Sequence, residues 1–391
     1  MRVAYICADA GIPVFGCKGA SVHIQEVLRA LVKKGAEIVL FASRIDSPPP
    51  PDLQGIQLCP LPRSKTKNAR DRAEAAVTGN QQLVQALQDK GPFDLVYERY
   101  SLWSHAGLDF ACRQGWKTVL EVNAPLIEEQ RNYREQVDEE QASFVLRRLL
   151  DSAAAVVAVS PGVKDYLASF YGSAARVSVI ANGVDPARFP APLHPPLADI
   201  DGGQVVIGFL GTLKPWHGLT TLAEAFRLLH AQRPQTLLLI VGEGPERATL
   251  AAAFDCFGLS ESVIFSGGVP PAEVPGWLAK MDIAVAPYPA LAGFYFSPLK
   301  IYEYMAASLP VVTTRVGHLA GVVNEGQTGL LVEPDNPVAL GKAIGQLVDN
   351  PLLRQQLGRA GRIHVTAQHS WDAVTGQILQ IADIRSAERE P

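Results

Sequence analysis

Residues 20–42 are ASVHIQEVLRALVKKGAEIVLFA, a helical pattern followed by a short run of apolar residues. Another apolar run, RVAYICA at 2–8, precedes this stretch. The alternation of Val-, Ile- and Leu-rich runs with helical patterns continues along the whole chain, which is typical of parallel sheets covered by helices on both faces. The sequence therefore predicts the α/β class.

The apolar runs form two series with a proline-rich stretch between them. We expect two doubly wound, Rossmann-like domains facing across a cleft, because each series can form its own open sheet with ligands at the carboxyl ends of the strands. The predicted divisions are a first domain at 1–185, a linker at 186–203, a second domain at 204–368 and a C-terminal helix at 369–391. The predicted strands are 2–8, 36–42, 93–98, 117–122, 155–160 and 177–182 in the first series, and 205–210, 236–242, 263–268, 282–288, 310–314 and 329–333 in the second.

Composition excludes several classes of function. With 391 residues, 48% of them hydrophobic, and a net charge of −4, the chain can bury a large core and has no general attraction for nucleic acid. The five cysteines are scattered without metal or redox spacing, which indicates reduced thiols and a cytoplasmic protein. No export signal and no apolar run of about 18–20 residues is found, so no membrane span is expected.

One basic stretch stands out at 62–72, PRSKTKNARDR. Its cations could meet an acidic acceptor or a membrane surface, although a solvated loop that enters a helix is the favoured interpretation. The cations are Arg63, Lys65, Lys67, Arg70 and Arg72.

Three turns in the second series end a strand with glycine, at 209–218, 240–246 and 266–271. Glycine lets the backbone approach a ligand closely, but a single such turn is more often explained by tight packing between strand and helix. None matches a dinucleotide fingerprint or a phosphate loop, so dehydrogenases and nucleotide hydrolases are poorly supported.

A lysine lies in the first turn of the helix expected within 297–312, SPLKIYEYMAASLPVV. Ser297 is the predicted N-cap and Pro298 the first helical residue. The free N–H groups there make a cation unfavourable by roughly 0.3–1 kcal/mol. Two interpretations remain open: Lys300 pairs with Glu303 on the surface, or it helps to hold an anion at the helix N-terminus.

The order of the motifs is more specific than any of them alone. In the second series it runs GTLKPWHG, VGEGPE, GG, DIAVAPY, SPLKIYEYMAASLPVVTT and EGQTGLLVEPDNPVAL; in the first, GASVHIQEVLRALVKKGAEI, VVAVSPGVKDYL and VIANGVDPARF. This order resembles the retaining glycosyltransferases of family 4, which have the GT-B fold. The resemblance implies a hexosyltransferase that moves a hexose or N-acetylhexosamine from a UDP- or GDP-linked donor to an unidentified hydroxyl acceptor, with no metal or cofactor and a C-terminal helix that crosses back to the first domain.

The resemblance also implies the donor site. Lys300 would stabilise the charge of the departing diphosphate, and Glu303, the second acid of the family's E-x7-E motif, would accept hydrogen bonds from the ribose hydroxyls. The catalytic candidates are Asn123, Lys300 and Tyr295. The donor- and nucleotide-binding candidates are Gly211, Thr212, Lys214, His217, Gly242, Gly244, Val269, Phe296, Ser297, Pro298, Leu299, Lys300 and Glu303.

The chain departs from the family pattern at four of these positions. Tyr295 replaces the first acid of the motif, Asn123 replaces a histidine, and Thr212 and His217 replace an arginine and a lysine. Cationic help would then come from Lys300, from Lys214 or from a protonated His217.

The acceptor site is expected in the first domain, at Gly16, Lys18, Gly19, Ser21, His23, Glu98, Arg99 and Glu121. Each group also has a structural interpretation: a glycine turn capped by Ser21, an ion pair of Glu98 and Arg99 with each other or with a neighbour, and a carboxylate at Glu121 that only braces Asn123. We expect His105 to be a satisfied surface histidine rather than a base. The sequence does not indicate an oligomeric state.

Rival functions are a same-fold epimerase or phosphorylase and a two-lobed binding protein without chemistry. An epimerase or phosphorylase would want further acids or a lysine for pyridoxal phosphate, neither of which is found in the sequence.

Overall fold

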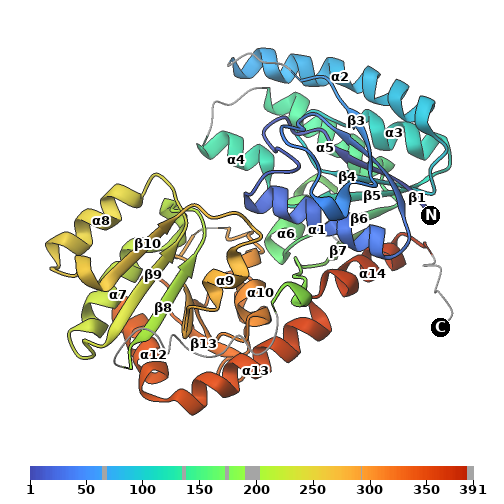
Figure 1. The fold of residues 1–391 in the computed structure, drawn as a ribbon. Helices are drawn as coiled ribbons and strands as arrows, with labels where there is room; N and C mark the ends of the chain where they lie inside the picture. The colour runs from blue at the N-terminus through green and yellow to red at the C-terminus, as the bar shows by residue number, and fades with distance from the viewer. Residues whose placement is uncertain (64–67, 134–137, 172–175, 190–202, 292, 385–391) are drawn as a thin grey trace, which may run out of the picture. The chain divides into compact units, whose positions relative to one another are not determined.

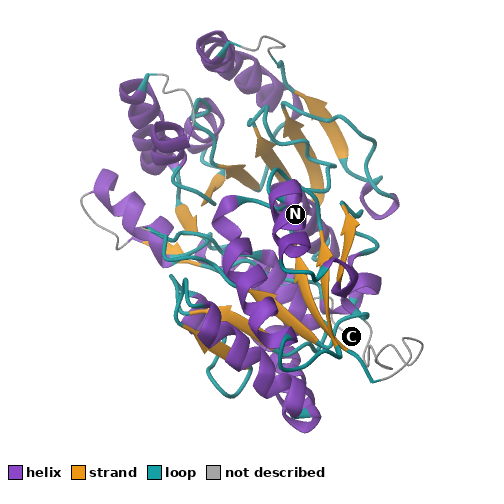
Figure 2. Cartoon of the chain, turned by 90° about the vertical axis from the view of Figure 1, so that its left-hand side faces the viewer, coloured by secondary structure: helices purple, strands orange, loops and turns teal. Residues whose placement is uncertain are grey.

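The structure is a computed structural model that describes residues 1–63, 68–133, 138–171, 176–189, 203–291 and 293–384. The chain forms two compact units: unit 1 comprises residues 1–182 and 371–391, and unit 2 comprises residues 183–370. Each unit has a parallel sheet with helices on both faces (Figures 1 and 2). The predicted α/β class with two Rossmann-like domains is confirmed.

Unit 1 contains seven parallel strands in the order β3-β2-β1-β4-β5-β6-β7. Sequential strands are added outward from β1 on both sides, so the carboxyl ends of β1 and β4 meet where the chain changes direction, the usual place for a ligand. The strands are β1 Arg2–Cys7, β2 Glu37–Ala42, β3 Gln57–Pro60, β4 Leu95–Arg99, β5 Lys117–Val122, β6 Ala155–Ala158 and β7 Val177–Val179.

The helices of unit 1 bury apolar stripes on this sheet. In α1, Ile24, Val27, Leu28 and Leu31 follow the i, i+3, i+4, i+7 spacing of one helix face, and all four are fully buried. The helices are α1 Gly19–Lys33, α2 Ala69–Lys90, α3 Ala106–Arg113, α4 Leu126–Tyr133, α5 Glu139–Ser152, α6 Pro161–Tyr171 and α14 Trp371–Ile381, with a 3₁₀ turn at Pro51–Leu53.

The last helix, α14, belongs to unit 1 and lies beside α1 (Figure 1). Trp371 packs its ring edge-on against His23 at 5.1 Å between centroids, and Val374, Ile378 and Leu379 are buried. The predicted return of the C-terminal helix to the first domain is therefore confirmed.

Unit 2 contains six parallel strands in the order β10-β9-β8-β11-β12-β13. Its core is aliphatic and aromatic, with Phe209, Phe226 and Ile240 at its centre. The strands are β8 Val205–Leu210, β9 Thr236–Val241, β10 Val263–Gly267, β11 Ile283–Ala286, β12 Val311–Thr314 and β13 Gly329–Val332. The helices are α7 Leu219–His230, α8 Arg247–Cys256, α9 Val274–Leu278, α10 Leu299–Ala306, α11 Leu319–Val322, α12 Pro337–Asp349 and α13 Pro351–Gln368, with 3₁₀ turns at Pro186–Arg188, Pro215–His217 and Ser260–Ser262.

Two elements differ from the sequence predictions. The edge strand β3 was missed, because four residues with only Leu58 and Cys59 half-buried give a weak pattern. The helix predicted from Ser297 begins at Leu299, with Pro298 as N-cap, and the Ser297 hydroxyl lies 3.1 Å from the Tyr302 hydroxyl. The predicted linker at 186–203 falls largely on residues 190–202, outside the described part, and residues 183–189 belong to unit 2.

Candidate active site

Helix α10 is anchored at the carboxyl ends of β8 and β11 by one tyrosine. The hydroxyl of Tyr304 accepts a hydrogen bond of 2.7 Å from the backbone N–H of Leu210 and donates one of 3.4 Å to the carbonyl of Val285. Tyr304 is itself fully buried. The first turn of α10 is thereby fixed at the strand ends, where a parallel sheet is expected to bind its ligand.

Lys300, in this first turn, is buried and makes no hydrogen bond through its ammonium to any described residue. Its residue is 8% exposed, and its ammonium has no hydrogen-bond acceptor in the part of the chain that the structure describes. The ammonium lies 4.1 Å from the ring centroid of Phe209 and 5.5 Å from that of Tyr288. Because the Nζ atom makes no hydrogen bond to Glu303, the interpretation of Lys300 as half of a surface ion pair is wrong.

Burial changes the acidity of this lysine. The loss of water lowers the pKa of Lys300 to about 7, and the nearby charge of Glu303 opposes this effect only in part. A cation–π contact replaces some of the lost hydration, but not the three hydrogen bonds of an ammonium. An anion that enters here would gain a strong charge-assisted partner.

The glycine turns around Lys300 are in direct contact with one another. Gly211 has φ +141°, and a Cβ there would lie 2.7 Å from the Lys300 ammonium. Gly242 has φ +148°, and a Cβ at that residue would come within 1.9 Å of the Gly211 carbonyl oxygen. A Cβ at Gly244 would lie 2.4 Å from the carbonyl oxygen of Leu213. These glycines are therefore required by backbone packing around the lysine.

His217 packs beside the loop that follows β8. Its Nδ1 donates a hydrogen bond of 2.5 Å to the carbonyl of Thr212. Desolvation and the nearby Lys300 cation lower the pKa of His217 to about 3, although the bond to Thr212 opposes this shift. This shift disfavours a protonated His217 in the ligand-free protein, and Lys214, whose Nζ lies 5.4 Å from the Trp216 ring, is the other cation among the predicted donor-binding residues.

The other predicted donor-binding residues lie on the same strand-end loops of unit 2. The rings of Tyr295 and Phe296 pack at 4.3 Å between centroids. Thr212 is exposed, and Val269, Pro298, Leu299 and Glu303 are half-buried.

In unit 1, His23 and Glu121 form a buried pair. Nε2 of His23 lies 2.6 Å from Oε1 of Glu121, and the two residues are 3% and 2% exposed. Burial alone would raise the pKa of Glu121, but His23 and Arg99 together hold it below its ordinary value. Asn123 is half-buried, and its Oδ1 has no hydrogen-bond partner in the described chain.

Glu98 and Arg99 do not pair with each other. They are successive residues of β4, so their side chains project from opposite faces of the sheet. Glu98 accepts a hydrogen bond of 2.6 Å from the Ser104 hydroxyl, and burial raises its pKa to about 7 in spite of that bond. Arg99 is opposite Glu121 in the register of β4 with β5, and its charge helps to lower the pKa of Glu121, although no ion pair joins the two side chains among the described residues.

Ser21 is bonded to the glycine turn before α1. Its hydroxyl donates to the carbonyl of Pro13 at 2.5 Å, and the N-cap of α1 is Lys18, which provides no side-chain cap. A Cβ at Gly16 would lie 2.9 Å from Pro13, whereas Gly19 is open to its surroundings. His105 is the N-cap of α3, with Nδ1 3.2 Å from Asp109 Oδ2, in agreement with a surface role.

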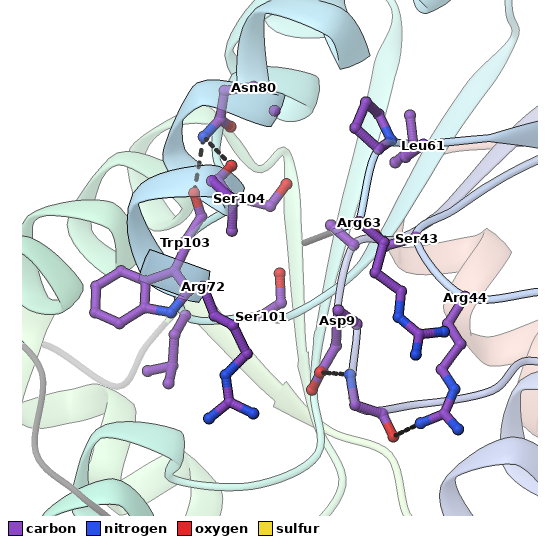
Figure 3. A pocket seen from close by; sticks show the side chains of 18 of the residues that line it. Asp9, Ser43, Arg44, Leu61, Arg63, Arg72, Asn80, Ser101, Trp103 and Ser104 are labelled. Atoms are coloured by element: carbon purple, nitrogen blue, oxygen red, sulfur yellow. Dashed lines mark hydrogen bonds between the residues drawn. The ribbon is translucent and has the colours of Figure 1, made fainter. Parts of the chain in front are cut away.

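A cavity of about 670 Å³ lies within unit 1 at the carboxyl ends of β1 to β4, between α2 and α4 (Figure 3). Its lining includes Asp9, Arg44, Arg72, Ser101 and Trp103. None of the eight predicted acceptor residues is among the lining residues. The basic stretch at 62–72 supplies Arg63 and Arg72 to the lining of this cavity. It was the one feature of the sequence that could have indicated the cavity, but we interpreted it as a solvated loop.

The described residues contain no group of three or more His, Cys, Asp or Glu side chains able to hold a metal ion. None of the helices in the described ranges has the length and apolar character needed to span a membrane. The five cysteines are not in disulfides.

The arrangement of both sheets has counterparts among solved structures. Anabaena HepE in complex with UDP-glucose superposes with a TM-score of 0.72 at 17% identity, over 98% of this chain and 99% of that one. The fold is that of the GT-B glycosyltransferases, with two Rossmann-like parallel-sheet domains.

Two family models match the sequence. The model of Glycosyltransferase Family 4 matches residues 18–188, and that of Glycosyl transferases group 1 matches residues 204–350, so together they span most of the chain. The chain belongs to the family-4 glycosyltransferases, as the order of its motifs predicts.

Curated relatives agree with this assignment. D-inositol 3-phosphate glycosyltransferase of Arthrobacter sp. is 26% identical over 88% of this chain and 85% of its own length. A GDP-mannose-dependent α-(1-6)-phosphatidylinositol monomannoside mannosyltransferase of Mycolicibacterium smegmatis is 31% identical over 64% of this chain and 66% of its own.

Proposed function

We propose that the protein is a retaining hexosyltransferase that moves a hexose or an N-acetylhexosamine from a UDP- or GDP-linked donor to a hydroxyl acceptor without a metal ion. The observation that carries the proposal is the buried ammonium of Lys300 at the strand ends of unit 2, which has no hydrogen-bond acceptor among the described residues. Such a group is costly unless a ligand of opposite charge completes it.

A nucleoside diphosphate is a suitable ligand for this site. During transfer the bond between the anomeric carbon and the diphosphate oxygen breaks, and negative charge grows on the leaving group. Lys300 and the first-turn amides of α10 are fixed before the reaction, so they stabilise this charge without reorganising. The acceptor oxygen then bonds to the anomeric carbon on the face that the diphosphate left, and the acceptor proton is released.

Glu303 is proposed to bind the donor ribose. A carboxylate accepts hydrogen bonds and donates none, so it suits two adjacent hydroxyls. It lies one helical turn after Lys300, on the same side of α10. In the family's roles, Tyr295 would contact the donor sugar, and Asn123 would offer a hydrogen bond in unit 1 where other members carry a histidine.

Each of the two proposed donor nucleotides, uridine and guanosine diphosphate, has support from one similar protein. A relative at 31% identity is described as GDP-mannose-dependent, and a structural neighbour was solved with UDP-glucose. Both donors share the diphosphate and ribose that the residues above would bind.

The proposal is tested by a thermal-shift panel of UDP, GDP, ADP and the corresponding nucleotide sugars, in buffer with EDTA. A ligand that binds only the folded state must raise the unfolding temperature, and we expect UDP or GDP to do so at micromolar to millimolar concentration. The absence of a shift with every nucleoside diphosphate would overturn the proposal, and a shift that requires a divalent ion would overturn its metal-independent part.

Turnover separates the transferase from its rivals. The donor that gives a shift is incubated with candidate acceptors, and the anomeric configuration of the product is read by proton NMR. Retention in a new glycoside supports the proposal; an altered sugar formed from the donor alone would indicate an epimerase, and tight binding without any turnover would indicate a binding protein.

A further inference from the structure

The cavity of unit 1 has the size and the position of a second binding site. About 670 Å³ accommodates a sugar or polyol with one substituent, since small-molecule sites typically measure roughly 300–1,000 Å³. Its walls come from the loops after β1, β2, β3 and β4, the strand ends at which ligands bind in an open parallel sheet. Strand topology and volume both favour a small molecule here.

The cations of this cavity are not equivalent. Arg44 and Arg63 share the carboxylate of Asp46, at 2.5 and 3.0 Å. Arg72, on α2, has no ion-pair or hydrogen-bond partner for its side chain in the described chain, although it lines the cavity. Figure 3 shows its guanidinium on one side of Asp9 and those of Arg63 and Arg44 on the other. The cation available to a ligand is therefore Arg72.

Two further groups point to a ligand with hydroxyls. The hydroxyl of Ser101 is buried without a hydrogen-bond partner among the described residues, and the residue is only 5% exposed. Asp9 receives one hydrogen bond, from the Gly11 N–H at 2.7 Å, and a carboxylate can accept several. A purely apolar ligand would leave both groups unsatisfied.

An aromatic side chain completes the lining. Trp103 is half-buried, and its indole forms one wall beside Ser101 and Ser104 (Figure 3). An indole face packs well against the C–H face of a sugar or cyclitol ring, because its surface is large and flat. A flexible anion without a ring would not use this wall.

We propose that this cavity binds the acceptor, and that the acceptor is a sugar or polyol carrying a phosphate or carboxylate, with the anion at Arg72, the ring on Trp103 and hydroxyls at Asp9 and Ser101. This inference rests on the proposed function, because only a transferase has an acceptor. The anionic polyol is either a free molecule or the headgroup of a lipid. Both carry the anion, the ring and the hydroxyls that the cavity would bind.

The test compares Arg72→Met with Arg70→Met by isothermal titration. Arg70 lies on the same helix but pairs with Glu74 and does not line the cavity, so it is a matched control. The probes are myo-inositol 1-phosphate, glucose 6-phosphate and glucuronate, each beside its uncharged parent sugar or cyclitol. We expect at least one anionic probe to bind, with a loss of about tenfold or more in Arg72→Met and no change in Arg70→Met, as for a lost charged hydrogen bond.

A second variant tests the ring wall. Trp103→Leu is expected to weaken the anionic probe and its uncharged parent by the same factor, whereas Arg72→Met affects the anionic probe alone. Equal loss in the two arginine variants, or wild-type binding that does not distinguish anionic from neutral probes, would overturn the inference.

Vesicle binding determines whether the anionic polyol is a free molecule or a lipid headgroup. Phosphatidylinositol and phosphatidylglycerol vesicles are compared by flotation with neutral phosphatidylcholine. Binding to phosphatidylinositol that Arg72→Met abolishes and Arg70→Met retains indicates a lipid headgroup; equal binding to every anionic vesicle, unaffected by Arg72→Met, would overturn the inference in favour of a general membrane surface.

The UDP and GDP thermal shifts are recorded on the same samples. A retained nucleotide shift with no binding of any anionic probe or phosphatidylinositol vesicle rejects only the acceptor assignment. If UDP and GDP do not raise the unfolding temperature of the wild-type protein, the proposed function itself is rejected.

Discussion

The ammonium of Lys300 occupies the space that a side chain at Gly211 would need: a Cβ at position 211 would lie 2.7 Å from Nζ and 3.1 Å from Cε. The glycine and the lysine come from different elements, the loop after β8 and the first turn of α10. A charge held in this way costs stability in the empty protein, and a bound diphosphate would recover that cost.

Replacing Lys300 by Met should separate stability from binding. We expect the unfolding temperature to rise, because an uncompensated buried ammonium is removed, and nucleoside diphosphate binding to weaken by about 1.5–3 kcal/mol, as for a lost hydrogen bond to a charged group. Calorimetric titration and thermal unfolding measure the two effects. Lys342→Met, at an exposed residue of α12, is the control and should change neither. Unchanged nucleotide affinity in Lys300→Met would remove the lysine from the site.

Nucleotide affinity should fall as pH rises above neutrality. With a pKa of about 7, Lys300 is half neutral at pH 7 and largely neutral at pH 9, and a diphosphate must re-protonate it on binding. The affinity is expected to decrease by up to about tenfold per pH unit above 7, which corresponds to about 1.4 kcal/mol. Titrations in two buffers of different ionisation enthalpy measure the accompanying proton uptake. In Lys300→Met the slope should vanish, and a persisting slope would assign it to another group.

The stability of the ligand-free protein should also depend on the protonation of Lys300, but it should rise with pH, whereas nucleotide affinity falls. Because the folded-state pKa is lower than the ordinary value of 10.5, the unfolded chain binds more protons between pH 7 and 10.5. The contribution of Lys300 to the free energy of unfolding therefore rises with pH over that window. Denaturant titrations of wild type and Lys300→Met isolate this contribution as the difference between the two curves.

Gly211→Ala should damage both the turn and the lysine. A φ of +141° is strained for any residue with a Cβ, and the added methyl group would displace the ammonium. We expect a loss of about 1–3 kcal/mol in the free energy of unfolding together with weaker nucleotide binding. Gly276→Ala is the matched control, since a Cβ there meets no atom within 4 Å and φ is not positive. Equal stability of the two variants would contradict the close approach.

Glu303→Gln should weaken a donor nucleotide only when its ribose carries hydroxyls. The amide keeps the shape of the carboxylate but loses its charge and one acceptor position. UDP or GDP should lose affinity, whereas the 2′,3′-dideoxy analogue should bind the variant and the wild type alike. Competition titrations with the two nucleotides give the comparison, and the same loss for both would reject the ribose assignment.

The His23–Glu121 pair should behave as one unit. His23→Phe leaves a buried carboxylate without its partner and is expected to cost about 3–5 kcal/mol of unfolding free energy. Adding Glu121→Leu should restore part of this loss, because the unpaired charge is gone, and chemical denaturation of the single and double variants yields the coupling energy. Since the pKa of Glu121 is lowered in the folded state, the stabilisation by the pair should be lost as pH falls below the ordinary glutamate value. Additive effects of the two substitutions would show that the residues are not coupled.

Periodicity predicted the sheets well because parallel strands buried on both faces give strong apolar runs. It failed at β3, where an edge strand with one partner leaves Gln57 and Pro60 exposed. The capping pattern placed the start of α10 two residues early, since the helix begins at Leu299 with Pro298 as its N-cap.

Of the two candidate sites, the sequence predicted the one around Lys300 and did not predict the cavity of unit 1. Lys300 and the glycine turns follow one another in a recognisable order, so sequence alone brought them together. The cavity of unit 1 is assembled from side chains between Ala8 and Gln130, contributed by four strand ends and two helices. No local pattern marks Ser101 or Trp103 as neighbours of Asp9, and only the basic stretch drew attention to Arg72.

The return of α14 to unit 1 orders events during synthesis. Trp371 leaves the ribosome only after every residue of unit 2, yet its indole covers the imidazole of His23. A nascent chain that ends before residue 371 has all of unit 2 and an uncovered face on α1. The first unit to begin folding is thus the last that can be completed.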